Sequence, residues 1–181
     1  MPPAAFILLG DALWLDFVNT ARGRTCHSPD LLPDADAYAT WCALQRLEPG
    51  ADRATFARVL EVRERLTTLA EALHEGRQLP GKAIAVLNEQ LGRSGGTQQL
   101  TRVAGDWRLH FLPARPLAAL EAIARSAART LADVGTAVRR CAGETCSLFF
   151  TDTSPTGSRR WCDPATCGVN GRVERRRGNR R

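Results

Sequence analysis

The sequence predicts a mainly α-helical chain: a helical N-terminal domain with a small β-hairpin, then a small C-terminal four-cysteine module made of a β-hairpin and a short helix. Three observations predict this fold class. Apolar residues recur at helical spacing through most of the first 131 residues, one short stretch alternates apolar and polar residues, and four of the six cysteines lie in the last 43 residues. A chain of 181 residues can bury one ordinary core and carry a small appendage. We therefore expect domains over residues 1–136 and 137–181.

Two short amphipathic helices are expected at the start of the chain. The first covers residues 11–20, with Asp11 as its cap, and the second begins at Asp34 and ends before Pro49-Gly50. Their apolar faces consist of Leu13, Trp14, Phe17 and Val18, and of Tyr38, Trp41 and Leu44. Residues 21–33 contain one glycine and two prolines, which predict a loop.

Three more helices and a hairpin complete the expected N-terminal domain. The longest helix is expected over residues 52–75, because apolar residues recur every three or four positions and charged residues fill the opposite side. Gly76 should end it, and shorter helices are expected over residues 80–91 and 117–131. Between these two, residues 98–112 alternate around an Ala104-Gly105-Asp106 turn, which predicts a β-hairpin.

The positive charge of the chain is concentrated at its C-terminal end. The formal net charge is +6, yet residues 1–138 hold 15 basic and 15 acidic side chains. The surplus comes from residues 139–181, where ten arginines accompany four acidic residues. This asymmetry predicts that a polyanion contacts the C-terminal segment. The alternative is a basic tail that is merely solvated.

The N-terminal sequence does not resemble a targeting signal. It has no positively charged leader, and Asp11 interrupts its apolar run early. No stretch approaches transmembrane length, so we expect no membrane partner and a cytoplasmic location. Thiols stay reduced in the cytoplasm. Clustered cysteines in such a protein are therefore interpreted as metal ligands or catalytic groups in preference to disulfides.

The C-terminal cysteines form two short pairs, C-x4-C, fifteen residues, C-x4-C, at Cys141, Cys146, Cys162 and Cys167. Two such pairs predict a tetrahedral all-thiolate site for one Zn²⁺, with two short strands in the insert, at residues 148–151 and 159–161. Four thiolates leave no coordination position for water, so the zinc would be structural. Two disulfides, four unlinked thiols or an iron-sulfur cluster are the alternatives. Asp163-Pro164 is typical of a helix start.

The N-terminal domain offers no catalytic constellation. Cys26, His27 and Cys42 have no third group placed beside them, and the sequence lacks a phosphate-binding glycine loop, a nucleophile elbow and a His-Glu metal motif. We therefore expect no enzyme activity. A small-molecule pocket is a hypothesis for one set of residues: Trp14, Asp16, Asn19 and Trp41. Core aromatics and a hydrogen-bonding pair would explain the same residues.

Arginines around and beyond the cysteines are candidates for nucleic-acid contact. Arg172, Arg175 and Arg176 fall at helical spacing, and Arg177 continues them. Guanidinium groups donate bidentate hydrogen bonds to phosphates and guanine edges. The other candidates flank the cysteines: Arg139, Arg140, Arg159 and Arg160. If about four arginines meet phosphates, the logarithm of affinity should fall against the logarithm of salt concentration with a slope of roughly −3.6.

These residues resemble the CGNR zinc-finger proteins, whose N-terminal part is the ABATE domain of bacterial stress-induced transcription regulators. The matching motifs are LDFVNT at residues 15–20 and FTDTS at residues 150–154, followed by RRWC at residues 159–162. The resemblance spans nearly the whole chain and implies zinc on the four C-terminal cysteines and DNA contact from the basic residues around them. One departure is the name-giving Cys-Gly-Asn-Arg, since this chain reads CGVNGR at residues 167–172.

The function expected from the sequence is a DNA-binding transcription regulator. The finger and its tail would contact duplex DNA, while the N-terminal domain would bind a small-molecule effector or form a homodimer. The alternative is a zinc-stapled RNA- or protein-interaction module. Readers of single-stranded RNA expose several aromatic residues, and the finger has only Phe149, Phe150 and Trp161.

Overall fold

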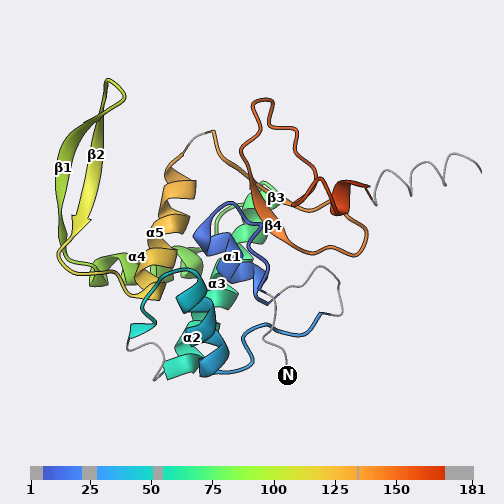
Figure 1. The fold of residues 1–181 in the computed structure, drawn as a ribbon, viewed down its shortest axis with the longest axis horizontal. Helices are drawn as coiled ribbons and strands as arrows, with labels where there is room; N and C mark the ends of the chain where they lie inside the picture. Colours follow the sequence, from blue (N-terminus) through green and yellow to red (C-terminus); the bar gives the residue numbers. More distant parts are fainter. Residues whose placement is uncertain (1–5, 22–27, 51–54, 134, 170–181) are drawn as a thin grey trace, which may run out of the picture.

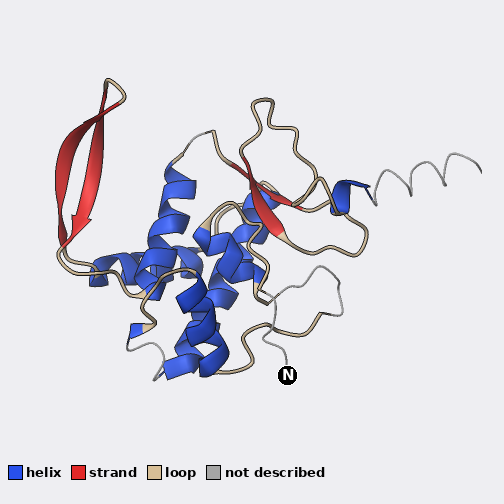
Figure 2. Cartoon of the chain, in the orientation of Figure 1, coloured by secondary structure: helices blue, strands red, loops and turns tan. Residues whose placement is uncertain are grey.

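Five helices and two small antiparallel sheets make up the described part of the computed structural model, residues 6–21, 28–50, 55–133 and 135–169 (Figures 1 and 2). In chain order the elements are α1 (Leu13–Asn19), α2 (Ala35–Leu44), α3 (Phe56–His74), α4 (Gly81–Arg93), β1 (Gly96–Val103), β2 (Asp106–Pro113), α5 (Ala119–Ala132), β3 (Ala137–Arg140) and β4 (Phe149–Asp152). None of the helices in these residues is long and apolar enough to cross a membrane. Cys26 and His27 lie outside the described residues.

The first two helices confirm the sequence prediction with two corrections. The cap position of α1 belongs to Ala12, because Asp11 adopts a left-handed backbone conformation (φ 56°). In α2, Asp34 caps as predicted and accepts a hydrogen bond from the backbone N–H of Ala37 (2.8 Å). Leu44 was expected to be buried but is 56% exposed, and Cys42 faces the core instead. The buried face of α2 therefore ends with Cys42, two residues before the helix does.

The helical core forms around α3, which contacts α1, α4 and β3. Aromatic rings fill the space between α1 and α2: Phe17 lies 5.4 Å from Trp41 and 6.4 Å from Tyr38, measured between ring centroids. Such pairs add to the burial of their apolar surface. Gly76 ends the α3 segment as predicted, with a positive φ of 63° that glycine adopts without strain.

The β1–β2 hairpin projects away from the helices (Figure 1). Its two-residue turn, Ala104-Gly105, has positive φ at both positions, which matches the twist of hairpin strands. The strands pair Leu100 with Leu109 and Arg102 with Trp107. Since residues two apart lie on the same face, one side of the hairpin is largely apolar and exposed, with Trp107 68% accessible.

The second sheet corrects the strand pairing that we expected in the cysteine module. The strand predicted at residues 148–151 is present as β4, but its partner is β3, and residues 159–161 form no strand. One edge of β4 pairs with β3, and on the other side Thr151 donates its backbone N–H to the carbonyl oxygen of Gly10 (2.9 Å). Residues 159–161 therefore have no free edge of β4 to join.

The cysteine module packs directly against the helices. The amide side chain of Asn19 forms two hydrogen bonds with the backbone of Phe149, to its carbonyl oxygen (2.8 Å) and from its N–H (2.9 Å). Phe149 and Val138 belong to the helical core, while Ile7 and Leu9 pack on the cysteine cluster. The predicted boundary at residues 136–137 falls between α5 and β3, yet side chains from both segments pack across it.

Candidate metal centre

The four C-terminal cysteines meet in one cluster. Their Sγ atoms all lie within 4.8 Å of one another, and Cys162 lies 3.8 Å from both Cys146 and Cys167. A tetrahedron with Zn–S bonds of about 2.3 Å has S–S edges of about 3.8 Å, so the donor set fits one zinc ion. A disulfide would need a separation of about 2.05 Å, and the four thiols are not linked.

The first cysteine pair lies in the link between β3 and β4. The backbone N–H of Cys141 donates to the carbonyl oxygen of Leu148 (2.9 Å), and that of Cys146 donates to Gly143 (3.0 Å). A Cβ atom at Gly143 would lie 3.2 Å from the Cβ of Cys146, so this tight turn favours glycine. The backbone of Cys162 donates to Sγ of Cys141 (3.4 Å), which joins the second pair to the first.

Asp163 begins a turn between the two cysteines of the second pair, and the helical segment follows at residue 167 rather than at the expected Pro164. The Asp163 carboxylate accepts hydrogen bonds from the backbone N–H of Ala165 (2.9 Å) and from the hydroxyl of Thr166 (2.7 Å). The resulting turn leads into a helical segment at residues 167–169, which begins at the ligand Cys167. The turn thus returns the chain to the cluster five residues after Cys162.

The electrostatics of the cluster favour a bound cation. The hydrogen bond between Cys141 and Cys146 lowers the pKa of Cys141 to about 2 and raises the pKa of Cys146 to about 12. Hydrogen bonds with Cys141 and Cys146 also raise the pKa of Cys162. Neighbouring thiols therefore oppose one another's ionisation, and a divalent metal is needed to hold all four as thiolates. With four thiolates bound, the site is closed and structural.

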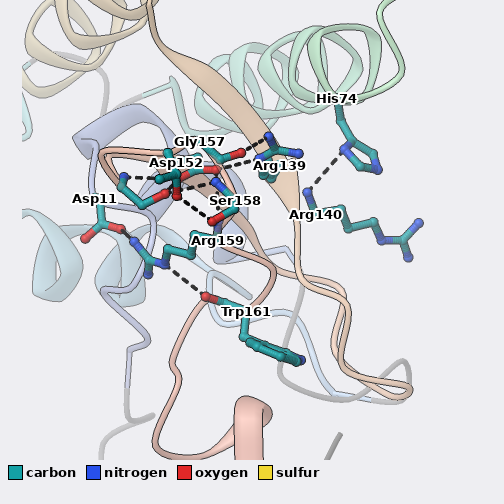
Figure 3. A network of polar contacts seen from close by, with 11 residues as sticks. Asp11, His74, Arg139, Arg140, Asp152, Gly157, Ser158, Arg159 and Trp161 are labelled. Carbon is teal, nitrogen blue, oxygen red and sulfur yellow. Dashed lines mark hydrogen bonds and ion pairs between the residues drawn. The ribbon is translucent and has the colours of Figure 1, made fainter.

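Arg159 connects the segment of the second cysteine pair to the residue before α1, and Figure 3 shows its contacts with Asp11 and Trp161. Its guanidinium group donates to the carbonyl oxygens of Trp161 (2.9 Å) and Cys162 (2.5 Å) and forms an ion pair with Asp11. The same group lies 4.5 Å above the ring of Phe150. One side chain thus joins the second cysteine pair, β4 and the residue preceding the cap of α1.

The buried carboxylate of Asp152 pairs with Arg139, whose side chain is 40% exposed. This carboxylate accepts from Nε of Arg139 (2.7 Å) and from the backbone N–H of Arg159 (3.1 Å), and Arg139 also donates to the carbonyl oxygen of Gly157 (2.5 Å). Hydrogen bonding from Ser154 lowers the pKa of Asp152, so the carboxylate is charged at neutral pH. Arg139, predicted as a nucleic-acid contact, is therefore paired within the chain, because the buried carboxylate of Asp152 requires donors. The guanidinium group of Arg159, another predicted contact, pairs instead with the exposed Asp11.

Two predicted nucleic-acid contacts remain on the surface of the described finger. Arg140 and Arg160 are exposed, and the guanidinium group of Arg160 lies 5.5 Å from the centre of the Trp161 ring. The backbone N–H of Ala142 donates to the carbonyl oxygen of Arg160 (2.8 Å), which places the segments that carry these arginines beside each other. The remaining candidates lie outside the described residues: Arg172, Arg175, Arg176 and Arg177.

The four residues of the hypothetical ligand pocket have packing and hydrogen-bonding roles. Trp14 and Trp41 are fully buried in the core, and Nε1 of Trp14 donates to the hydroxyl of Thr130 (3.0 Å). Asn19 binds the backbone of Phe149, and Asp16 accepts from the backbone N–H of Gly10 (2.8 Å). These contacts favour the structural interpretation of all four residues.

Asp16 should make the stability of the chain depend on pH. Burial raises the pKa of Asp16 from 3.8 to about 6, so the folded state prefers the protonated carboxyl. Its stabilising contribution is complete below about pH 4 and is lost as pH rises through about 6. Asp16→Asn keeps an acceptor for Gly10 and removes this titration. Urea unfolding should show that, between pH 5 and pH 8, the unmodified chain loses roughly 1–2 kcal/mol relative to the variant. Parallel pH profiles for the two proteins would contradict the expectation.

Family models match the two segments of the chain separately. The ABATE model, described as "Putative stress-induced transcription regulator", matches residues 11–134, and the CGNR zinc-finger model matches residues 137–180. The resemblance seen in the sequence is thereby confirmed over nearly the whole chain. A search of curated proteins found no match to the chain. The four clustered cysteines lie in the CGNR segment, which identifies the metal they are arranged to bind as zinc.

Proposed function

Because the chain belongs to the ABATE family and carries a CGNR zinc finger, we propose that it regulates transcription by binding duplex DNA through this finger and its arginine-rich tail. The observation that carries the proposal is the pair of exposed arginines beside the metal cluster. Arg140 directly precedes Cys141, and Arg160 lies two residues before Cys162. A zinc ion that fixes these cysteines would also fix the backbone from which both guanidinium groups extend.

The finger favours a duplex over single-stranded RNA as its partner. Sequence-tolerant binding of single strands uses exposed aromatic rings on which bases stack. In the finger, Phe149 and Phe150 are buried, and Trp161 packs on the cysteine cluster below Arg160. Phosphate contacts from arginine need no such platform. We therefore propose that affinity comes mainly from charge, with base contacts adding selectivity.

The helical domain would supply the regulatory input. Its segment, residues 1–138, has no net charge, so it is a poor DNA-binding surface but can bind an effector or a second copy of the chain. The contact between Asn19 and Phe149 connects α1 directly to the finger. We also propose that the chain acts by binding rather than by catalysis, since a four-thiolate zinc has no position for a substrate. Such a regulator would work in the bacterial cytoplasm.

Salt dependence of DNA binding tests this proposal. For the zinc-loaded chain we expect the logarithm of affinity to fall against the logarithm of salt concentration with a slope of roughly −3.6, measured by fluorescence anisotropy on duplex DNA. If Arg140 and Arg160 each meet a phosphate, the Arg140→Gln, Arg160→Gln variant should reduce the slope by about 1.8. Arg108→Gln on the exposed hairpin is the matched control and should leave the slope unchanged. A slope near zero, or an equal reduction in the control, would refute the proposal.

The β1–β2 hairpin favours a second candidate function, a zinc-stapled module that binds protein or RNA. Leu100, Trp107 and Leu109 are exposed on one face of the hairpin, and exposed apolar patches often mark protein-binding surfaces. Under this alternative the finger is a scaffold, and the affinity for duplex DNA does not depend on Arg140 and Arg160. The same salt titration therefore separates the two functions.

A further inference from the structure

A cavity of about 520 Å³ lies where the start of α1, the end of β2 and one face of α5 meet. Its volume is in the range of about 300–1,000 Å³ that is typical of small-molecule sites. Apolar walls come from Leu13, Phe111 and Leu117. The cavity is lined by none of the four residues that the sequence indicated for a pocket.

Two arginines of α5, Arg125 and Arg129, line this cavity one helical turn apart. Arg125 is half-buried and Arg129 is exposed at the mouth of the cavity. Neither forms an ion pair with a carboxylate in the described part of the chain, whereas other arginines that are at least partly buried do: Arg58, Arg63 and Arg139. Burial, together with the charge of Arg129, lowers the pKa of Arg125. An anion in the cavity would relieve both effects, because it would neutralise the paired positive charges.

The orientation of Arg125 is fixed by Phe111. The guanidinium carbon lies 3.9 Å from the centre of the Phe111 ring, so the plane of the charged group is held against an apolar wall of the cavity. Ser126 also lines the cavity, and its Oγ accepts a hydrogen bond from the backbone N–H of Trp14 (3.4 Å). The hydroxyl proton of Ser126 is therefore directed to another acceptor.

Only one acidic side chain, Asp11, is among the described residues that line the cavity. Its carboxylate pairs with Arg159, which also donates to the carbonyl oxygen of the zinc-ligand residue Cys162. The charge of Asp11 is therefore balanced from the finger and does not neutralise Arg125 or Arg129. The same ion pair places the cavity one contact away from the metal centre.

We propose that this cavity binds a small organic carboxylate with an aromatic or aliphatic body, whose charged end is held by Arg125 and Arg129. The planar guanidinium groups match the two oxygens of a carboxylate, and Leu13, Phe111 and Leu117 contact the apolar body. As the effector site of the regulator, the cavity rests on the proposed function; as a binding site, it stands on these contacts alone.

Calorimetric titration of the zinc-loaded full chain without DNA tests the inference. The probes are benzoate, 4-phenylbutyrate and octanoate, with benzamide and inorganic phosphate as comparisons. We expect at least one carboxylate to bind at millimolar concentration or below, and the neutral amide and phosphate to bind more weakly. Because DNA is absent, the result does not depend on whether the finger binds DNA.

Variants of the cavity complete the test. Arg125→Gln and Arg129→Gln should each weaken carboxylate binding by about tenfold or more, while Arg108→Gln should not change it. Ala122→Phe fills the cavity and keeps both arginines, so it should also prevent binding while the zinc content stays at one per chain. The inference is overturned if none of the carboxylates binds, if phosphate binds as well as they do, or if the cavity variants bind like the unmodified chain.

Discussion

Replacing Cys162 by serine is expected to abolish metal binding and to unfold the C-terminal finger. Cys162 is 1% exposed and lies 3.8 Å from two of the other thiols, so its loss removes the central contact of the cluster. Structural zinc supplies roughly 10–16 kcal/mol in small finger domains, and a unit of this size buries too little apolar surface to fold without it. Metal analysis should show that the zinc content falls from one ion per chain to none.

Hydrogen exchange shows where the structure is lost in this variant. Amides of β3, β4 and residues 141–169 should lose protection, and the unfolding midpoint should fall because Val138 and Phe149 leave the helical core. Cys42→Ser is the matched control, since Cys42 is a buried thiol of α2 outside the metal cluster. It should keep one zinc per chain. A Cys162→Ser chain with full zinc content and unchanged protection would contradict the assignment.

Replacing Asn19 by alanine is expected to separate the finger from α1. Asn19 is 1% exposed, and its amide provides hydrogen-bond partners for both the N–H and the carbonyl oxygen of Phe149. Each buried group left without a partner costs about 1–3 kcal/mol, so we expect a loss of roughly 2–5 kcal/mol in the free energy of unfolding. Denaturant unfolding measures this loss. Hydrogen exchange should show that protection is lost first at β4.

Asn88→Ala is the control for Asn19→Ala. Asn88 is exposed on α4, and an exposed substitution of this kind changes stability by about 0.5 kcal/mol or less. The expected loss in the free energy of unfolding is therefore several times larger for Asn19→Ala than for Asn88→Ala. Equal stability of the two variants would show that the contact between Asn19 and Phe149 does not hold the finger to the helices.

Local signals in the sequence predicted the helices and the cysteine cluster well. Apolar periodicity located α1 to α5, Asp34 acted as the predicted cap, and the Ala104-Gly105 turn joined the predicted hairpin. Asp163 begins a turn as expected, but the helical segment starts at Cys167. The paired spacing of the cysteines predicted a donor set that the fold brings together. These features depend on contacts between residues close in the sequence, or on chemistry that allows few alternatives.

The strand pairing that was wrong, and the internal contacts that the sequence did not reveal, involve residues distant in the sequence. The partner of β4 could not be read from its own residues, because the choice between β3 and residues 159–161 is decided by Gly10, about 140 residues earlier. Charge alone did not show that Arg139 would meet Asp152 or that Arg159 would meet Asp11. Asn19, a polar residue in an apolar helix, indicated that its side chain has a hydrogen-bond partner. The sequence could not identify that partner, because it is the backbone of Phe149, 130 positions away.

Mapping of bound DNA across the genome of the organism that encodes the chain tests the central claim most directly. The comparison is between the intact chain and a Cys146→Ser, Cys162→Ser variant, since a truncation before β3 would also remove Val138 and Phe149 from the helical core. If the zinc-built finger binds DNA, the intact chain is enriched at discrete sites and the variant, present at equal concentration, is not. Equal enrichment of the variant at the same sites, or no enrichment of the intact chain anywhere, would contradict the account.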